Sequence, residues 1–139
     1  MPRDKQLERS LLLIRISVAA FLLVWALDKM LVPEHAAAVF GKYYMIGGLP
    51  SGVMTALGIA QVALIAAFAG GLARTWTYGV VFVMHAVSTF STMPHLINPF
   101  AEGRQILFWT GVPVLAAIAA LFVLRERDCM LSIDSARSQ

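Results

Sequence analysis

Residues 11–32 read LLLIRISVAAFLLVWALDKMLV, a stretch of about the length that a helix needs to cross the hydrocarbon core of a bilayer. It is apolar almost throughout, but it carries Arg15 near its start and Trp25, Asp28 and Lys29 near its end. Ionisable groups at membrane depth are unfavourable unless they are paired or hydrated, so they are candidate functional residues. The stretch therefore predicts a first membrane span with a polar site near its second end.

The composition extends this prediction to the whole chain. Its 139 residues are 59% hydrophobic and only 14% charged, whereas soluble domains are nearer to half apolar and about a quarter charged. Three further apolar stretches, residues 51–73, 75–93 and 105–124, are long enough to span a bilayer. The sequence thus predicts an all-α, membrane-embedded four-helix bundle that occupies residues 11–124 as one domain.

The connection between the first two spans predicts an additional short helix. Pro33 stands where a new helix can begin, because proline is favoured in the first helical turn. The segment 34–44 that follows is too short and too mixed in character to cross a bilayer. It is therefore expected to be an interfacial half-helix, with Phe40, Tyr43 and Tyr44 as aromatic anchors.

The basic residues set the predicted orientation. The residues on the side of the termini and of the second connection are Arg3, Lys5, Arg9, Arg15, Arg74, Arg125, Arg127 and Arg137. The other side has Lys29, Lys42 and Arg104. By the positive-inside rule, the lead-in 1–10 and the tail 125–139 are both predicted to be cytoplasmic. Arg15 is then expected to snorkel toward the interface, and no nucleic acid is expected as a partner.

This topology gathers most of the polar and titratable side chains in the outer half of the bundle. They are Asp28, Lys29, Glu34, His35, His85, His95, Asn98, Glu102 and Arg104, with Gln61 at mid-depth. His85 shares a helix face with Ser88, Thr89 and Thr92, which follow at i+3, i+4 and i+7. The pattern predicts an outward polar cavity with Asp28 and His85 as candidate catalytic residues. The candidate ligand-binding residues are Trp25, Lys29, Gln61, His95, Asn98 and Arg104.

Alternatives stay open for these residues. Asp28 and Lys29 either face the cavity or lie at the membrane interface beside Trp25, which would then join an aromatic belt. His85 is either a neutral histidine bonded between helices, or a proton relay and hydrogen-bond donor to a quinone carbonyl. Ligation of a metal or haem is a further alternative, although no ligand-spacing motif supports it. Its candidates are His35, His85 and His95.

Three short motifs give the chain a resemblance to a known family. They are LLLIRISVAAFLLVWALDK (11–29), LAR (72–74) and SID (132–134), and together they resemble the DoxX family of small four-span bacterial membrane proteins. The chain has WALD at 25–28 where the family has a small residue and glycine, and Gln61 where the family often has an acid. The residues of this chain that match the family's pattern are Arg15, Lys29 and Asp134. It implies a redox role, such as a subunit of thiosulfate:quinone oxidoreduction or a membrane partner of thiol-stress enzymes.

The single cysteine, Cys129, excludes an intramolecular disulfide or dithiol. A redox protein without a cysteine pair must take its electron carrier from a ligand or a partner. The first functional prediction is therefore a redox-associated membrane protein that binds a quinone-like or other small ligand, held by Asp28, Lys29 and His85. The alternatives are a non-catalytic subunit that docks a larger membrane or redox complex, and a small permease or metal-handling protein that self-associates.

Overall fold

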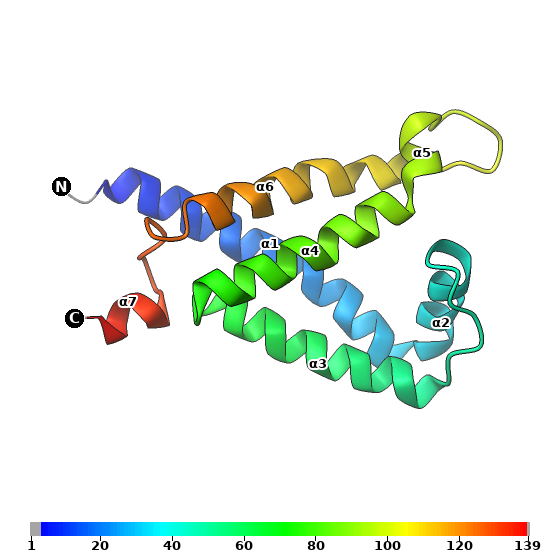
Figure 1. Ribbon diagram of the computed structural model, residues 1–139, viewed down its shortest axis with the longest axis horizontal. Coiled ribbons are helices and arrows are strands. Elements are labelled where there is room, and N and C mark those ends of the chain that lie inside the picture. The colour runs from blue at the N-terminus through cyan, green and yellow to red at the C-terminus, as the bar shows by residue number, and fades with distance from the viewer. Residues whose placement is uncertain (1–3, 139) are drawn as a thin grey trace.

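The computed structural model describes residues 4–138, and every regular element in that range is a helix. Four long helices pack along one another (Figure 1). These are α1 (Lys5–Leu31), α3 (Ser51–Ala69), α4 (Arg74–Ser91) and α6 (Gly111–Val123). The shorter elements are α2 (Pro33–Tyr43), α5 (Met93–Ile97), the 3₁₀ helix η1 (Ile106–Thr110) and α7 (Ile133–Arg137). The prediction of an all-α chain is confirmed.

Three helical segments are long and apolar enough to cross a membrane: Lys5–Leu31, Ser51–Ala69 and Ile106–Val123. Large apolar side chains on them, such as Leu13, Ile59 and Val123, point away from the protein interior. The chain is therefore a candidate multi-pass membrane protein, and three of the four predicted spans correspond to these segments.

The first helix begins earlier than its apolar run. The carboxylate of Asp4 accepts hydrogen bonds from the backbone N–H groups of Gln6 and Leu7, both at 3.1 Å, and so caps the helix. Residues 5–10 of the predicted lead-in thus form the first turns of α1. The helix ends at Leu31, and Pro33 begins α2 as expected.

The closest approach between α1 and α3 occurs at a glycine. A Cβ atom on Gly58 would lie 2.6 Å from Met30 Cγ and 2.9 Å from the carbonyl oxygen of Ala26. Small residues allow helix backbones to approach closely in lipid. Gly58 therefore brings α3 against the part of α1 that carries the predicted polar residues.

Both termini lie at one end of the molecule, and α2 and α5 lie at the other (Figure 1). The tail folds back onto the connection between α3 and α4, where Ile133 N–H donates to Gly70 O at 2.9 Å. The Asp134 carboxylate accepts from the N–H groups of Ala73 and Arg74, at 2.8 and 2.9 Å. The described part of the tail is thus packed against the helices.

Arg15 does not snorkel. It is completely buried, and its Nη1 lies 2.9 Å from Oδ1 of the equally buried Asp128. Its Nη2 donates to the carbonyl oxygens of Met130 and Leu131, at 2.8 and 3.0 Å. Tyr78 completes the cluster, since its hydroxyl donates to Asp128 Oδ2 at 2.6 Å. The predicted interfacial position of Arg15 is wrong because the returning tail provides acceptors in the interior.

Apolar side chains fill the half of the bundle nearer the termini. The largest buried members are Leu11, Phe68, Val81, Ile118 and Leu121. The other half of the bundle lies between α2 and the late turns of α4. That half is less densely packed, because a cavity lies there.

Candidate functional site

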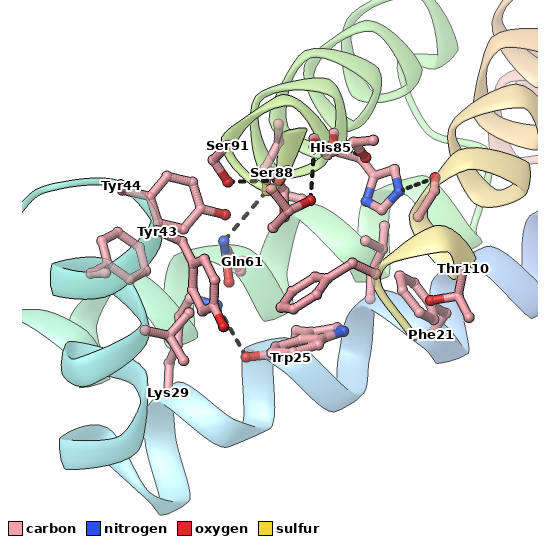
Figure 2. A pocket seen from close by; sticks show the side chains of 18 of the residues that line it. Phe21, Trp25, Lys29, Tyr43, Tyr44, Gln61, His85, Ser88, Ser91 and Thr110 are labelled. Atoms are coloured by element: carbon pink, nitrogen blue, oxygen red, sulfur yellow. Dashed lines mark hydrogen bonds between the residues drawn. The ribbon is translucent and has the colours of Figure 1, made fainter. Parts of the chain in front are cut away.

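A cavity of about 470 Å³ lies in the half of the bundle away from the termini. Its walls come from α1, α2, α3 and α4 and from the segment 105–111 (Figure 2). Much of the wall is aromatic, from Phe21, Trp25, Phe40, Tyr43, Tyr44 and Phe108. The volume falls within the range of small-molecule sites, and mixed aromatic and polar walls are typical of them.

One wall is the predicted polar face of α4. His85, Ser88, Thr89 and Thr92 all line the cavity, which confirms that their spacing places them on one face. His85 Nε2 lies 2.9 Å from the carbonyl oxygen of Gly111, the first residue of α6. Because a carbonyl only accepts, Nε2 carries the proton of this hydrogen bond.

The hydroxyl groups of this wall bond to their own helix. Thr89 Oγ1 donates to His85 O at 2.9 Å, and Thr92 Oγ1 donates to Thr89 O at 2.8 Å. Ser91 Oγ donates to Ser88 O at 2.7 Å. Such bonds to the preceding turn use the hydroxyl proton and leave the oxygen lone pairs as acceptors. These three hydroxyl groups therefore present acceptors, whereas the Ser88 hydroxyl, which makes no hydrogen bond within residues 4–138, can also donate.

Lys29 lies on the opposite wall, from α1. Its side chain is buried, with the residue only 8% exposed, and Nζ donates to the carbonyl oxygen of Trp25 at 3.1 Å. No carboxylate among residues 4–138 forms an ion pair with it. Of the two alternatives for Lys29, the structure favours the cavity. Trp25 also lines the cavity, although its side chain is partly exposed.

Asp28 does not line the cavity, but it contacts His35, which does. Both carboxylate oxygens of Asp28 lie 2.9 Å from Nδ1 of His35, a lining residue on α2. With Nδ1 bonded to the carboxylate, Nε2 is the ring nitrogen of His35 that remains for other partners. Asp28 thus orients a histidine at the cavity wall.

Gln61 joins the site from α3, as predicted. It lines the cavity, and its Nε2 donates to the sulfur of Met84 at 3.4 Å. Asn98 and Arg104 do not join it, because both are exposed in the connection between α5 and η1. A loop without helical periodicity gives no sequence signal for where its side chains point.

His95 is buried beside the cavity without lining it. Its ring centroid lies 4.4 Å from that of Phe108 and 5.7 Å from that of Tyr43. Its Nδ1 accepts from the N–H of Gln105 at 3.2 Å. Burial among these rings, together with the positive charge of Arg104, lowers the pKa of His95. The residue therefore packs as a neutral ring under the cavity rim.

The three histidines do not form a metal site together. Their surroundings differ, since His35 bonds to Asp28, His85 to Gly111 and His95 packs on aromatic rings. Within the described range 4–138, no three His, Cys, Asp or Glu side chains are placed to hold a metal ion.

Some cavity residues were assigned differently or missed from the sequence. Phe40, Tyr43 and Tyr44 were expected to anchor the chain at the membrane interface, and the structure places them in the cavity wall. Their i, i+3, i+4 spacing puts them on one face of α2. This shared face is the sequence signal that could have assigned them to the cavity wall. Phe21 and Phe108 were missed, because aromatic residues inside an apolar run do not stand out.

No protein-family model, curated protein or solved structure matches the chain. The function is therefore argued from the cavity and its residues.

Proposed function

We propose that the chain is a redox-associated, multi-pass protein of the bacterial inner membrane whose cavity binds a quinone-like or other small amphiphilic ligand. The observation that carries this proposal is Lys29, a buried amine that has one backbone acceptor and no carboxylate within ion-pair distance among residues 4–138, although the charge of Asp28 acts on it from farther away. A buried cation is unfavourable until an acceptor or opposite charge reaches it. A carbonyl or ionised oxygen of a ligand supplies that partner.

The aromatic walls support a planar ring as the ligand head group. Aromatic side chains pack well against flat π-systems, and Trp25 and Tyr43 lie near Lys29 in the cavity wall (Figure 2). Phe21 packs edge-on against His85, with ring centroids 5.8 Å apart. Because Phe21 and Lys29 are eight residues apart on α1, their backbones are separated by about 12 Å along the helix. A ligand ring that lies between Phe21 and Lys29 along α1 would reach toward both His85 and Lys29.

Proton handling is assigned to the histidines. His85 contacts the ligand from α4, and His35 exchanges protons between the ligand and the outside, because it both lines the cavity and is exposed. Asp28 is a positioning residue, which fixes the ring of His35 through its Nδ1. Electrons pass between the ligand and a partner redox protein.

We also propose that α4 is the fourth span. It packs between α3 and α6, which belong to candidate spans. Its outward side carries a continuous apolar stripe with helical spacing, and the exposed members are Trp76, Val80, Val83, Val87 and Phe90. Four crossings place both termini on the cytoplasmic side, with α2 at the outer interface.

Labelling of single cysteines tests this topology. In a Cys129→Ser background, Asn98→Cys is expected to react with a membrane-impermeant maleimide in intact spheroplasts. Ser138→Cys, at the end with the termini, is expected to react only after lysis. Both positions reacting from the same side would contradict the four-span arrangement.

Co-purification tests the ligand proposal. Organic extraction of the purified protein, followed by mass spectrometry, is expected to release a quinone-like compound. A Ser88→Trp variant, which fills the cavity from its wall, is expected to lose that compound. Its matched control is Val87→Trp, on the lipid-facing side of the same helix, and this variant should retain it. Wild-type protein that carries no such compound and binds no added quinone or quinol would contradict the proposal.

A further inference from the structure

We infer that the cavity selects the reduced, hydroxyl-bearing form of its ligand, a hydroquinone-type ring, over the oxidised dicarbonyl form. This inference rests on the proposed function, which places a quinone-like ring in the cavity. It goes further in stating which redox form is held. The argument is the distribution of hydrogen-bond donors and acceptors between the two walls.

The α4 wall offers acceptors. His85 Nε2 donates to Gly111 O, so in the neutral ring Nδ1 is an acceptor, and among residues 4–138 no protein donor reaches it. The hydroxyl protons of Thr89 and Thr92 are already bonded to backbone carbonyls of the same helix. What remains on this wall for a ligand is the Nδ1 acceptor of His85, the lone pairs of these hydroxyl oxygens, and the Ser88 hydroxyl, which can either accept or donate.

The α1 wall offers a donor. The Lys29 ammonium has three N–H groups, and the Trp25 carbonyl accepts from it at 3.1 Å. The rest of its donor capacity is left for an oxygen in the cavity. The two walls therefore suit a ligand that donates to His85 Nδ1 and accepts from Lys29.

A hydroquinone meets both requirements. One of its O–H groups donates to His85 Nδ1, and its other oxygen accepts from Lys29. A dicarbonyl ring accepts from Lys29 equally well but has no proton for His85 Nδ1, so that acceptor is left unpaired. A site built to receive a ligand O–H discriminates strongly against an analogue that lacks it, because the buried acceptor is left unpaired. We expect a preference of about tenfold or more for the reduced form.

Ligand analogues test this with the wild-type protein. The dissociation constants of a short-chain benzoquinol, its benzoquinone and the dimethyl ether of the quinol are measured by anaerobic calorimetry in detergent. The quinol is expected to bind at least about tenfold tighter than either of the others, because both others lack O–H donors. A quinone that binds as tightly as the quinol overturns the inference and leaves the proposed function standing. Absence of binding by all three overturns the proposed function as well.

Two variants tie the preference to the α4 wall. His85→Leu removes the imidazole acceptor, and Thr89→Val removes a lone-pair acceptor with little change in shape. Both are expected to reduce the ratio of quinone to quinol dissociation constants. Thr55→Val is the matched control, since Thr55 makes the same bond to its own helix, to Ser51 O at 3.0 Å, away from the cavity. An unchanged ratio in folded Thr89→Val and His85→Leu would overturn the inference.

Discussion

Arg15 Nη1 and Asp128 Oδ1 lie 2.9 Å apart, and both side chains are 0% exposed. The two residues are far apart in the sequence, one on α1 and the other beyond α6. Tyr78 of α4 bonds to the other oxygen of the same carboxylate. This cluster joins three parts of the chain at the end of the molecule that holds the termini, opposite the cavity.

The first prediction follows from this pair. Removing one member leaves the other charge buried without its partner, which typically destabilises a protein by about 3–5 kcal/mol. Arg15→Leu and Asp128→Leu are each expected to lower the unfolding temperature substantially, measured by thermal unfolding in detergent. The double variant Arg15→Met with Asp128→Leu is expected to recover much of the loss, because it leaves no unpaired charge.

Arg9→Leu is the control for the loss of an arginine from α1. Arg9 is exposed, and exposed substitutions usually change stability by less than about 0.5 kcal/mol. If Arg15→Leu unfolds at the same temperature as Arg9→Leu, the buried pair does not hold the tail to the helices.

The second prediction concerns Gly58. A methyl group there would meet the carbonyl oxygen of Ala26 at 2.9 Å and Lys29 Cβ at 3.1 Å. Gly58→Ala is therefore expected to separate α1 from α3, to lower stability by about 1–3 kcal/mol and to weaken ligand binding through Lys29. Thermal unfolding and ligand titration measure the two effects.

Gly52→Ala is the matched control, because Gly52 lies on the same helix and no atom comes within 4 Å of its added Cβ. Alanine is a better helix former than glycine, so this variant should be as stable as the wild type or more stable. Equal stability of the two variants would show that α1 and α3 do not depend on the close approach.

Hydropathy and helical spacing predicted much of the fold. The apolar runs gave the long helices, and Pro33 correctly marked the start of α2. The spacing of His85, Ser88 and Thr89 gave a cavity wall, since all three share one face of a regular helix. These features are local, so they can be derived from neighbouring residues alone.

The pairings between distant segments could not be derived in this way. Nothing near Arg15 indicates that Asp128 returns to meet it, and charge counting favoured a position at the interface. Asp28 was recognised as polar, but its contact with His35 depends on the turn of the chain at Pro33. Residues of the exposed connection, such as Arg104, have no periodicity that fixes their direction.

The third prediction is a pH dependence at the tail. Burial alone would raise the pKa of Asp134, but the N–H groups of Arg74 and Ala73 and the charge of Arg74 hold that pKa below its usual range. A carboxylate whose pKa is lower in the folded than in the unfolded protein stabilises the fold at pH values above its unfolded pKa of about 4. This stabilisation is lost as the pH falls below that value and through the folded pKa. Asp134→Asn is expected to be less stable than the wild type at neutral pH, with a difference that shrinks on acidification.

Thermal unfolding between about pH 3 and about pH 7 measures this difference. Glu126→Gln is the control, because Glu126 is an exposed carboxylate whose distance to Arg125 is 3.8 Å. It should remain close to the wild type throughout. A constant difference between Asp134→Asn and the wild type across the range would contradict the assigned role of the carboxylate.

The fourth prediction concerns Lys29. Lys29→Met keeps the length of the side chain and removes the ammonium, so the ligand oxygen loses its donor. Affinity for a quinone-like ligand is expected to fall by roughly 10- to 100-fold, as for loss of a charged hydrogen bond. Lys42→Met, at an exposed position of α2 outside the cavity, should bind like the wild type. Equal affinities of the two variants for the ligand would show that Lys29 does not contribute to ligand binding.

The most direct test is photolabelling with an azido-substituted quinone, followed by peptide mass spectrometry of the labelled sites. Label is predicted on cavity residues of α1 and α4, such as Trp25, Lys29 and Ser88, and excess unlabelled quinol should suppress it. Label confined to outward-facing positions away from the cavity, such as Val24 and Val87, and not displaced by the quinol, would contradict the proposed cavity site.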